Sequence, residues 1–313
     1  MGYQGIYVDD NISKDIQIVT MISDELKYRA KKEIGSLFVS VETNSSQKIA
    51  KSIETLEDVV SNIVDDIFRK RNIMVNVVDI RAYDDYTLSH SINVSVLSII
   101  IGTVLGMSRS TLNELAMSAL VHDIGKIFIN KKLVSKADKL TFDEFEELKK
   151  HSHLGYDYLL PNALFSEDVK QGVLMHHEKF DGTGYPHGAK GEEIPLFARI
   201  ISVADVYDAL TSDRPYRRAL LPSDAMEYIM SGYGTMFDPA IVNTFIRKVA
   251  PYPIGTCVRL NNGVTGIVVK NYENFFLRPK VKIIEDGKPT PKMIDLAHDV
   301  SALNITIQEV IDI

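Results

Sequence analysis

Apolar residues recur at steps of three and four along most of this chain, and that spacing restricts the fold more than any other feature. The clearest run begins at Ile49 and ends at Ile67, and a basic segment, residues 69–71, follows it directly. One face of a five-turn helix is therefore apolar, and the basic segment suits the negative end of the helix dipole. We predict a mainly α-helical protein.

Further helices follow from the same spacing and from capping residues. One carries His90 on an apolar stripe that continues to Val104. Boxes of the form Thr-x-x-Glu predict one helix start at Thr111 and another at Thr141, the latter helix continuing past His151. The remaining helices are expected over residues 166–178 and 196–211 and in two segments before residue 250, the second capped by Asp238.

The two ends of the chain differ from this helical part. Residues 1–45 combine two short predicted strands, over 6–8 and 16–19, with a helix over 22–37, which predicts a small N-terminal α/β appendage of unknown role. After residue 250, alternating segments are separated by turn sequences such as Asn261-Asn262-Gly263 and Asp286-Gly287. The expected domains are therefore residues 1–45, residues 46–250 and a small β-rich C-terminal module, residues 251–313.

Composition argues against several classes of function. A net charge of -7 and a pI near 5.7 are unlike those of a general DNA- or RNA-binding protein. The single cysteine, Cys257, cannot form an intrachain disulfide, and no signal peptide is visible, so we expect a cytoplasmic location. The longest apolar run, residues 94–107, is too short and too polar to span a membrane. Small-molecule partners are favoured, and a homodimer is left open.

Histidines and aspartates on apolar helical faces predict a metal centre. A single buried histidine is usually a hydrogen-bonded core residue, but five buried rings need many partners, and each unmet polar group costs roughly 1–3 kcal/mol. Imidazoles and carboxylates suit Fe, Mn, Co or Zn, and a helical bundle can project them inward from separate helices. The predicted ligands are His90, His122, Asp123, His151, His176, His177 and Asp205.

Three further segments are candidates for contacts with a phosphorylated ligand. Lys126 could meet a phosphate oxygen, although a solvated lysine at a helix end is an equal alternative. Tyr185 lies in a glycine-rich loop that would let the backbone approach a ligand closely, although alone the loop is an ordinary turn. Arg214 and Arg217 follow the helix of Asp205 and suit an anion, whereas pairing with surface acids is the more usual role.

The ordered set of motifs resembles the HD-GYP family, a branch of the HD phosphohydrolase superfamily whose members hydrolyse cyclic di-GMP. The resemblance covers roughly residues 50–250. It rests on His90-Ser91, His122-Asp123-Ile-Gly-Lys126, His151 with Gly155, His176-His177-Glu178, Asp181-Gly-Thr-Gly184-Tyr185-Pro186, Asp205 and Asp208 in Ala-Asp-Val-Tyr-Asp-Ala, and Arg214-Pro-Tyr-Arg217.

The resemblance implies an HD-type helical bundle in which the seven predicted ligands bind the metals and Asp123 bridges them. Members with three metals have a glutamate four residues before the first histidine, where this chain has Tyr86. We therefore expect two divalent ions, with Fe or Mn favoured over Co, Ni and Zn. The substrate contacts implied by the resemblance are Lys126, Tyr185, Asp208, Arg214 and Arg217.

The expected reaction is hydrolysis of cyclic di-GMP to pGpG, which a second cut would convert to GMP. Two ions would lower the pKa of a bridging water, and the resulting hydroxide would attack phosphorus in line with the departing 3′ oxygen. Asp123 and Lys126 would be catalytic, with Lys126 offsetting the developing charge.

Alternatives to this reaction stay open. A related phosphohydrolase would act on another cyclic dinucleotide or on a nucleotide. A metal-containing but inactive receptor would bind cyclic di-GMP and signal through the terminal modules. A purely structural helical protein is disfavoured, because it leaves the buried histidines unexplained.

Overall fold

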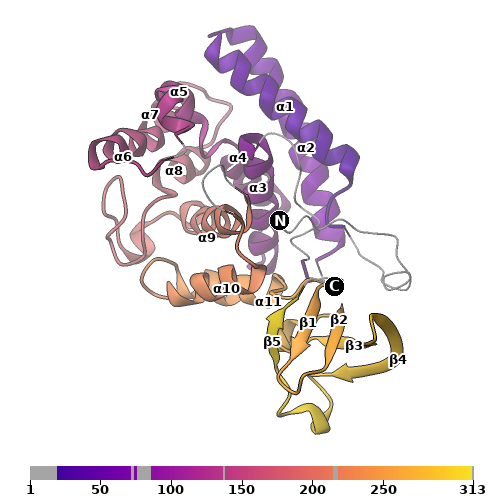
Figure 1. The fold of residues 1–313 in the computed structure, drawn as a ribbon. Coiled ribbons are helices and arrows are strands. Elements are labelled where there is room, and N and C mark those ends of the chain that lie inside the picture. Colours follow the sequence, from indigo (N-terminus) through magenta and orange to yellow (C-terminus); the bar gives the residue numbers. More distant parts are fainter. Residues whose placement is uncertain (1–19, 72–73, 76–85, 137, 214–217, 312–313) are drawn as a thin grey trace.

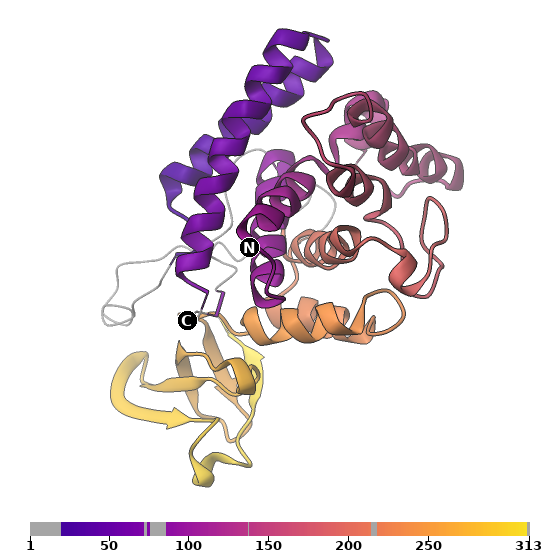
Figure 2. The ribbon, with the colours of Figure 1, turned by 180° about the vertical axis from the view of Figure 1, so that it is seen from behind.

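A computed structural model describes residues 20–71, 74–75, 86–136, 138–213 and 218–311, and in the helix that begins at Tyr86 it describes side chains from Leu88 onward. Figure 1 shows a helical body with a small β-sheet module at one end, which confirms the predicted mainly helical fold with a C-terminal β-module. Figures 1 and 2 show α1 (Asp24–Glu42) and α2 (Ser46–Arg69) side by side along one side of the body.

Three helices form the centre of the body, and each carries predicted ligands on it or directly after it. They are α3 (Tyr86–Val104), α4 (Arg109–Val121) and α9 (Leu196–Thr211). The other helical elements are η2 (Ile124–Phe128), α5 (Lys131–Val134), α6 (Phe142–Lys149), α7 (His151–Leu159), α8 (Glu167–Met175), η3 (Gly191–Glu193), α10 (Pro222–Ser231) and α11 (Pro239–Lys248).

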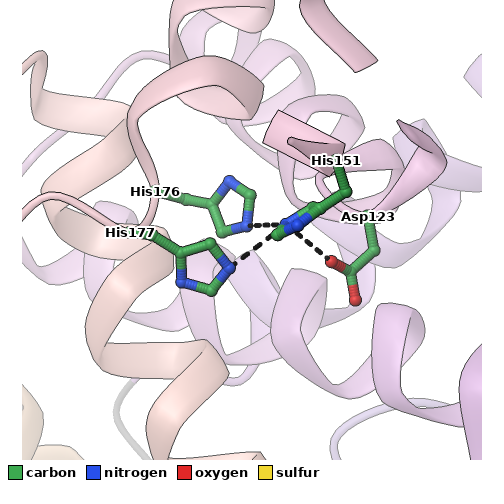
Figure 3. Close-up of side chains that lie close together, drawn as sticks. All are labelled: Asp123, His151, His176 and His177. Carbon is green, nitrogen blue, oxygen red and sulfur yellow. Dashed lines mark hydrogen bonds and ion pairs between the residues drawn. The ribbon is translucent and has the colours of Figure 1, made fainter. Parts of the chain in front are cut away.

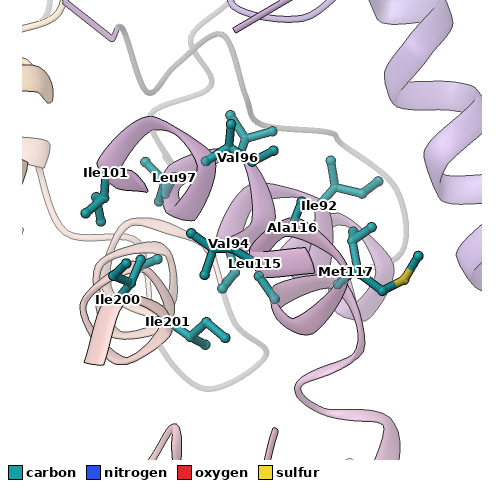
Figure 4. Packing of buried hydrophobic residues seen from close by; sticks show 14 of the residues in the cluster. Ile92, Val94, Val96, Leu97, Ile101, Leu115, Ala116, Met117, Ile200 and Ile201 are labelled. Carbon is teal, nitrogen blue, oxygen red and sulfur yellow. The ribbon is translucent and has the colours of Figure 1, made fainter. Parts of the chain in front are cut away.

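The packing of α3 fixes the centre of the body. Every residue from Ser89 to Gly102 is buried, as expected for a helix that is surrounded by other helices. Figure 4 shows Val94 of α3, Leu115 of α4 and Ile201 of α9 in one apolar cluster. Because full burial of such a side chain contributes about 1.5–3 kcal/mol, this cluster holds the three helices in fixed positions.

Helix starts agree with the sequence in part. The capping box at Thr141 is confirmed, because its hydroxyl accepts the Glu144 N–H and the Glu144 carboxylate accepts the Thr141 N–H. Asp238 caps α11 as predicted. The predicted start of α4 at Thr111 is wrong, because the Ser108 side chain accepts the Thr111 N–H and begins the helix earlier.

The single helix predicted after Thr141 is two helices, α6 and α7. The His151 ring donates to the Leu148 carbonyl at 2.7 Å, and the Ser152 hydroxyl donates to the Lys149 carbonyl at 3.0 Å. These side chains occupy carbonyls that a continuous helix would pair with backbone N–H groups. The bond to the Leu148 carbonyl orients the His151 ring.

The described part of the N-terminal segment is helical and shows no α/β appendage. The strands predicted over residues 6–8 and 16–19 lie outside the described residues. Helix α1 begins after the predicted start at residue 22 and continues past the predicted end at residue 37. Its Ala30 and Ile34 are buried in the same cluster as the central helices. Helix α1 therefore belongs to the packed helical body, while the division of the chain at residues 45 and 250 stays a prediction.

The C-terminal module is one antiparallel sheet in the order β4-β3-β2-β1-β5. The predicted turns are confirmed, since Gly263, Asp286 and Gly287 have φ of 83°, 51° and 71°, which glycine and aspartate tolerate. Two strands escaped sequence analysis because none of their side chains is fully buried and their exposure does not alternate. The strands are β1 (Cys257–Leu260), β2 (Thr265–Lys270), β3 (Lys280–Glu285), β4 (Lys288–Asp295) and β5 (Ile307–Val310).

Buried contacts attach this module to the helical body. Lys248, at the end of α11, donates to the Arg71 carbonyl at 3.0 Å and pairs with Glu273 of the module. Val75 forms a β-bridge with Val249 just before the module begins. Among the described residues, no helix combines the length and apolar character that a membrane crossing requires.

Candidate metal centre

All seven predicted ligands lie together in two clusters, and within each cluster the ligand atoms lie within 4.8 Å of one another. The side chains come from α3, α7 and α9 and from the residues that follow α4 and α8. The first cluster is Asp123, His151, His176 and His177, and the second is His90, His122 and Asp205.

Asp123 lies between the two clusters. Its Oδ1 atom is 3.5 Å from His151 Nε2, in the first cluster. Its Oδ2 atom is 3.4 Å from His122 Nε2 and 3.9 Å from His90 Nε2, in the second cluster. One carboxylate thus directs one oxygen to each cluster, which is the arrangement that a bridging ligand requires.

The imidazoles of the first cluster converge on one point. Figure 3 shows the His176 and His177 rings directed at His151, with Asp123 on the other side. The His151 Nε2 atom lies 3.4 Å from His176 Nε2 and 3.2 Å from His177 Nε2. Nitrogens that approach this closely are suited to sharing a cation, because neutral imidazole lone pairs gain nothing from facing one another.

Three of the predicted ligand histidines, taken over both clusters, have their second ring nitrogen fixed by the backbone. The Nδ1 atoms of His122, His151 and His176 each lie 2.7 Å from the carbonyl three residues earlier. Those carbonyls are in the last turn of a helix, where intrahelical partners are lacking. Because a carbonyl only accepts, Nδ1 carries the proton and the Nε2 lone pair is left for a metal.

His90 is oriented by a side chain instead. Its Nδ1 atom lies 2.7 Å from Asp208 Oδ2, and the other Asp208 oxygen accepts from Asn93 at 2.7 Å. Asp208 is buried, and both of its carboxylate oxygens have partners behind His90, while the substrate contact predicted for it stays a prediction.

Charge and burial set the protonation of the rings. Burial lowers the pKa of His177 to about 3 and holds the pKa of His176 well below its usual value. Burial also acts to lower the pKa of His90, but hydrogen bonds to Asp205 and Asp208 raise it to about 9. For Asp123, burial opposes the charged form, yet Lys126 and the neighbouring histidines keep its pKa well below the usual range.

Unpaired buried atoms show that the residues fit a pair of cations. Among the described residues, His122 Nε2 and Asp123 Oδ1 are buried without a hydrogen-bond partner. Leaving such atoms unpaired costs about 1–3 kcal/mol each. The set of imidazole nitrogens and carboxylate oxygens is one that divalent transition metals accept.

Two of the predicted substrate contacts lie beside the clusters. Lys126 Nζ is 2.5 Å from Asp123 Oδ2 and remains partly exposed. The Tyr185 ring stacks on the His177 ring, with centroids 4.8 Å apart and planes 29° apart. Burial and the charge of Asp205 raise the pKa of Tyr185, so its hydroxyl stays a neutral donor.

Glu178 holds the loop that carries Tyr185, a role that sequence analysis missed. Its buried carboxylate accepts the His187 N–H at 2.6 Å and the Gly188 N–H at 3.1 Å. Gly184 packs so closely that a Cβ there would lie 2.2 Å from the Lys179 nitrogen. The signal available in the sequence was the position of this acidic residue, directly after two predicted ligands and just before a glycine-rich loop.

Three residues named from the sequence fall outside what the structure describes. Arg214 and Arg217 lie outside the described residues. Tyr86 begins α3, but its side chain is outside the described part. The substrate contacts predicted for the arginines, and the choice of two metals over three, stay predictions.

Two family models match this chain. A family model described as HD domain matches residues 70–241, more than half of the chain. The chain belongs to the HD-domain family. A second model, described as a KOW domain associated with HD domain, matches residues 257–313, which include the β-sheet module next to the HD domain.

Two relatives and one solved structure resemble this HD-domain protein. It is 34% identical over 271 residues to the cyclic di-GMP phosphodiesterase PA4108 of Pseudomonas aeruginosa, covering 85% of this chain and 64% of that protein. It is 32% identical over 213 residues to 3′3′-cGAMP-specific phosphodiesterase 1 of Vibrio cholerae, covering 68% and 44%. The chain thus spans less than two thirds of either relative.

The HD-domain fold also has a counterpart among solved structures. Bd1817, described as an HDG"Y"P protein from Bdellovibrio bacteriovorus, matches with a TM-score of 0.54 and 20% identity. The match covers 70% of this chain and 69% of that one. At this identity the likeness concerns the fold alone.

Proposed function

We propose that this protein is a cyclic di-GMP phosphodiesterase of the HD-GYP branch, producing pGpG and, by a second cut, GMP. The observation that carries the proposal is the position of Asp123 between two clusters of histidines. Paired metal sites that share a ligand are a recurrent solution for phosphodiester hydrolysis. The activity named for the Pseudomonas aeruginosa relative supports the choice of substrate.

In this proposal each cluster holds one divalent ion and Asp123 contributes to both. Fe or Mn is favoured over Co, Ni and Zn, since the ligand set accepts several metals and availability decides. When bound, such ions act as Lewis acids toward water and phosphate oxygens. Two ions, rather than three, are proposed because Tyr86 stands where a further carboxylate would be needed.

The protein's own groups supply positioning and charge. The Lys126 ammonium lies at the partly exposed edge of the centre, where it would offset negative charge developing on phosphate oxygens. The neutral Tyr185 hydroxyl would donate to the substrate. Arg214 and Arg217 are retained as substrate contacts, whereas we assign Asp208 to orienting His90.

The first test compares the wild type with Asp123→Ala for release of pGpG, in Mn²⁺ or in anaerobic Fe²⁺. We expect turnover to fall below detection, because the charge shared by both clusters is removed while the fold is kept. The matched control is Asp168→Ala, an exposed aspartate of α8. Unchanged hydrolysis by Asp123→Ala would contradict the proposal, and three ions per chain by elemental analysis would contradict the two-metal assignment.

A substrate panel separates the alternatives. Preferred hydrolysis of 3′3′-cGAMP, the substrate named for the Vibrio cholerae relative, would assign a different cyclic dinucleotide to this site. Tight binding of cyclic di-GMP with no product under either metal would instead assign a receptor. A cytoplasmic location and a homodimer stay predictions.

A further inference from the structure

Helix α6 stands beside the candidate centre although it carries none of the predicted ligands. None of its residues is buried, and its aromatic side chains Phe142 and Phe145 are 77% and 44% exposed. A short helix normally buries an apolar stripe to compensate for the entropy of ordering it. The exposed aromatic groups of α6 therefore call for another explanation.

Phe145 continues a row of rings that begins at the metal centre. Its ring lies 6.4 Å from the Tyr185 ring at an interplanar angle of 84°. Tyr185 in turn stacks on His177. The row places a partly exposed aromatic surface two rings away from a predicted metal ligand.

Lys149 adds a cation to this surface. Its Nζ atom lies 4.9 Å from the Phe145 ring centroid and 5.3 Å from the Tyr185 centroid. An ion pair with Glu146 at 2.6 Å steadies the side chain, which is 28% exposed. The ammonium therefore lies on the same aromatic surface, where it can contact a planar group that stacks on Phe145.

This combination suits a guanine base. Flat bases stack on aromatic side chains without regard to sequence, whereas hydrogen bonds at the base edge distinguish one base from another. Guanine presents two acceptors, O6 and N7, where adenine presents one acceptor and an amino donor. A lysine ammonium carries only donors, so it favours guanine.

We propose that Phe145 and Lys149 form a base-binding subsite that selects guanine in the substrate. The inference rests on the proposed function and adds to it the residues that read the base. Phe145 supplies the stacking surface, and Lys149 discriminates guanine from adenine.

Stacking is tested with Phe145→Ala and with Phe142→Ala, the matched change on the same helix. We expect Phe145→Ala to raise KM for cyclic di-GMP roughly 5- to 150-fold, the range for losing the stacking of one base. The same variant should show a smaller rise in KM for bis(p-nitrophenyl) phosphate, which has no base. Phe145→Trp should restore KM, and Phe142→Ala should resemble the wild type.

Base selection is tested with Lys149→Met against Lys150→Met. Lys150 pairs with Glu147 in the same way, at 2.5 Å, but is 61% exposed. We expect Lys149→Met to reduce the preference for cyclic di-GMP over cyclic di-AMP by roughly 5- to 150-fold, the range for one base-edge contact. Lys149→Arg should keep most of the preference.

The outcomes separate this inference from the proposed function. Melting temperature and metal content identify variants that are misfolded. If Phe145→Ala or Lys149→Met is misfolded, Phe145→Trp or Lys149→Arg tests the same position in its place. If the wild type binds but does not cut cyclic di-GMP, the proposed function fails, and calorimetric binding constants test the subsite. If Phe145→Ala matches Phe142→Ala, or Lys149→Met matches Lys150→Met, the subsite is overturned while the proposed function stands. A wild type that neither binds nor cuts overturns both.

Discussion

Asp208 connects His90 to Asn93 through hydrogen bonds of 2.7 Å at each of its two oxygens. A carboxylate behind a ligand histidine fixes the tautomer and raises the basicity of the other ring nitrogen. An amide at this position keeps one oxygen that can accept from His90, but it removes the negative charge beside the ring. The geometry thus makes the charge of Asp208 part of the metal affinity.

We predict that Asp208→Asn lowers metal affinity about 10- to 100-fold, the usual cost of losing such an outer partner. Competition with a chelator measures the affinity, and Asp168→Asn, on the exposed side of α8, is the control. Wild-type metal binding combined with a raised KM for cyclic di-GMP would instead support the substrate contact predicted from the sequence.

Individual residues were predictable to different degrees. The seven predicted ligands lie together in the structure, and they could be picked out because their types, spacing and apolar surroundings are visible along the chain. The partner of His90 was not, since Asp208 lies 118 positions away and only the packing of α9 against α3 joins them. The role of Glu178 depends likewise on how the loop after it folds back.

The elements η2 and α7 approach each other closely, and a glycine permits it. A Cβ at Gly125 would lie 1.9 Å from the His151 carbonyl oxygen and 2.5 Å from the Gly155 nitrogen. These atoms belong to the backbone and cannot move aside without moving α7. The contact brings Asp123, just before η2, to His151.

We predict that Gly125→Ala destabilises the protein by at least about 1–3 kcal/mol, the usual cost of overpacking, and weakens metal binding by separating the two elements. Urea unfolding measures the first effect and chelator competition the second. Gly35→Ala is the control, because its Cβ would find only ordinary contact at 3.4 Å in the middle of α1, where alanine favours the helix. Equal stability of the two variants would contradict this account.

Helices whose apolar residues recur with a strong helical period were predicted well, whereas the positions of their ends were predicted less well. The apolar face of α2 and the capping box of α6 are visible in the sequence. The break between α6 and α7 is not, because it depends on side chains of His151 and Ser152 that prefer carbonyls to solvent.

At the scale of the whole molecule, Lys248 joins three parts of the chain. Its side chain is 9% exposed and contacts both the Arg71 carbonyl, after α2, and Glu273 in the β-sheet module. A buried ammonium is stable only while its partners remain in place. The presence of a β-rich module was predicted from its turns, but this attachment depends on residues 177 and 25 positions away from Lys248.

We predict that Lys248→Met loosens the β-sheet module and lowers the free energy of unfolding by about 1–3 kcal/mol, since the Arg71 carbonyl loses a charged donor. Limited proteolysis in the segment before β1 should become faster. Lys292→Met is the control, because its pair with Glu285 is exposed on the sheet. Identical cleavage rates for the two variants would show that the module is held by other contacts.

The backbone bonds to the histidine rings also bear on mutational tolerance. His122, His151 and His176 donate to carbonyls of residues 119, 148 and 173, and every amino acid supplies a carbonyl. These three bonds therefore do not require a particular side chain at residues 119, 148 and 173, although Ala119 and Val173 are buried and constrained by core packing. Among these four histidines only His90 is held by a side chain, so a substitution at Asp208 can retune the centre while leaving every predicted ligand unchanged.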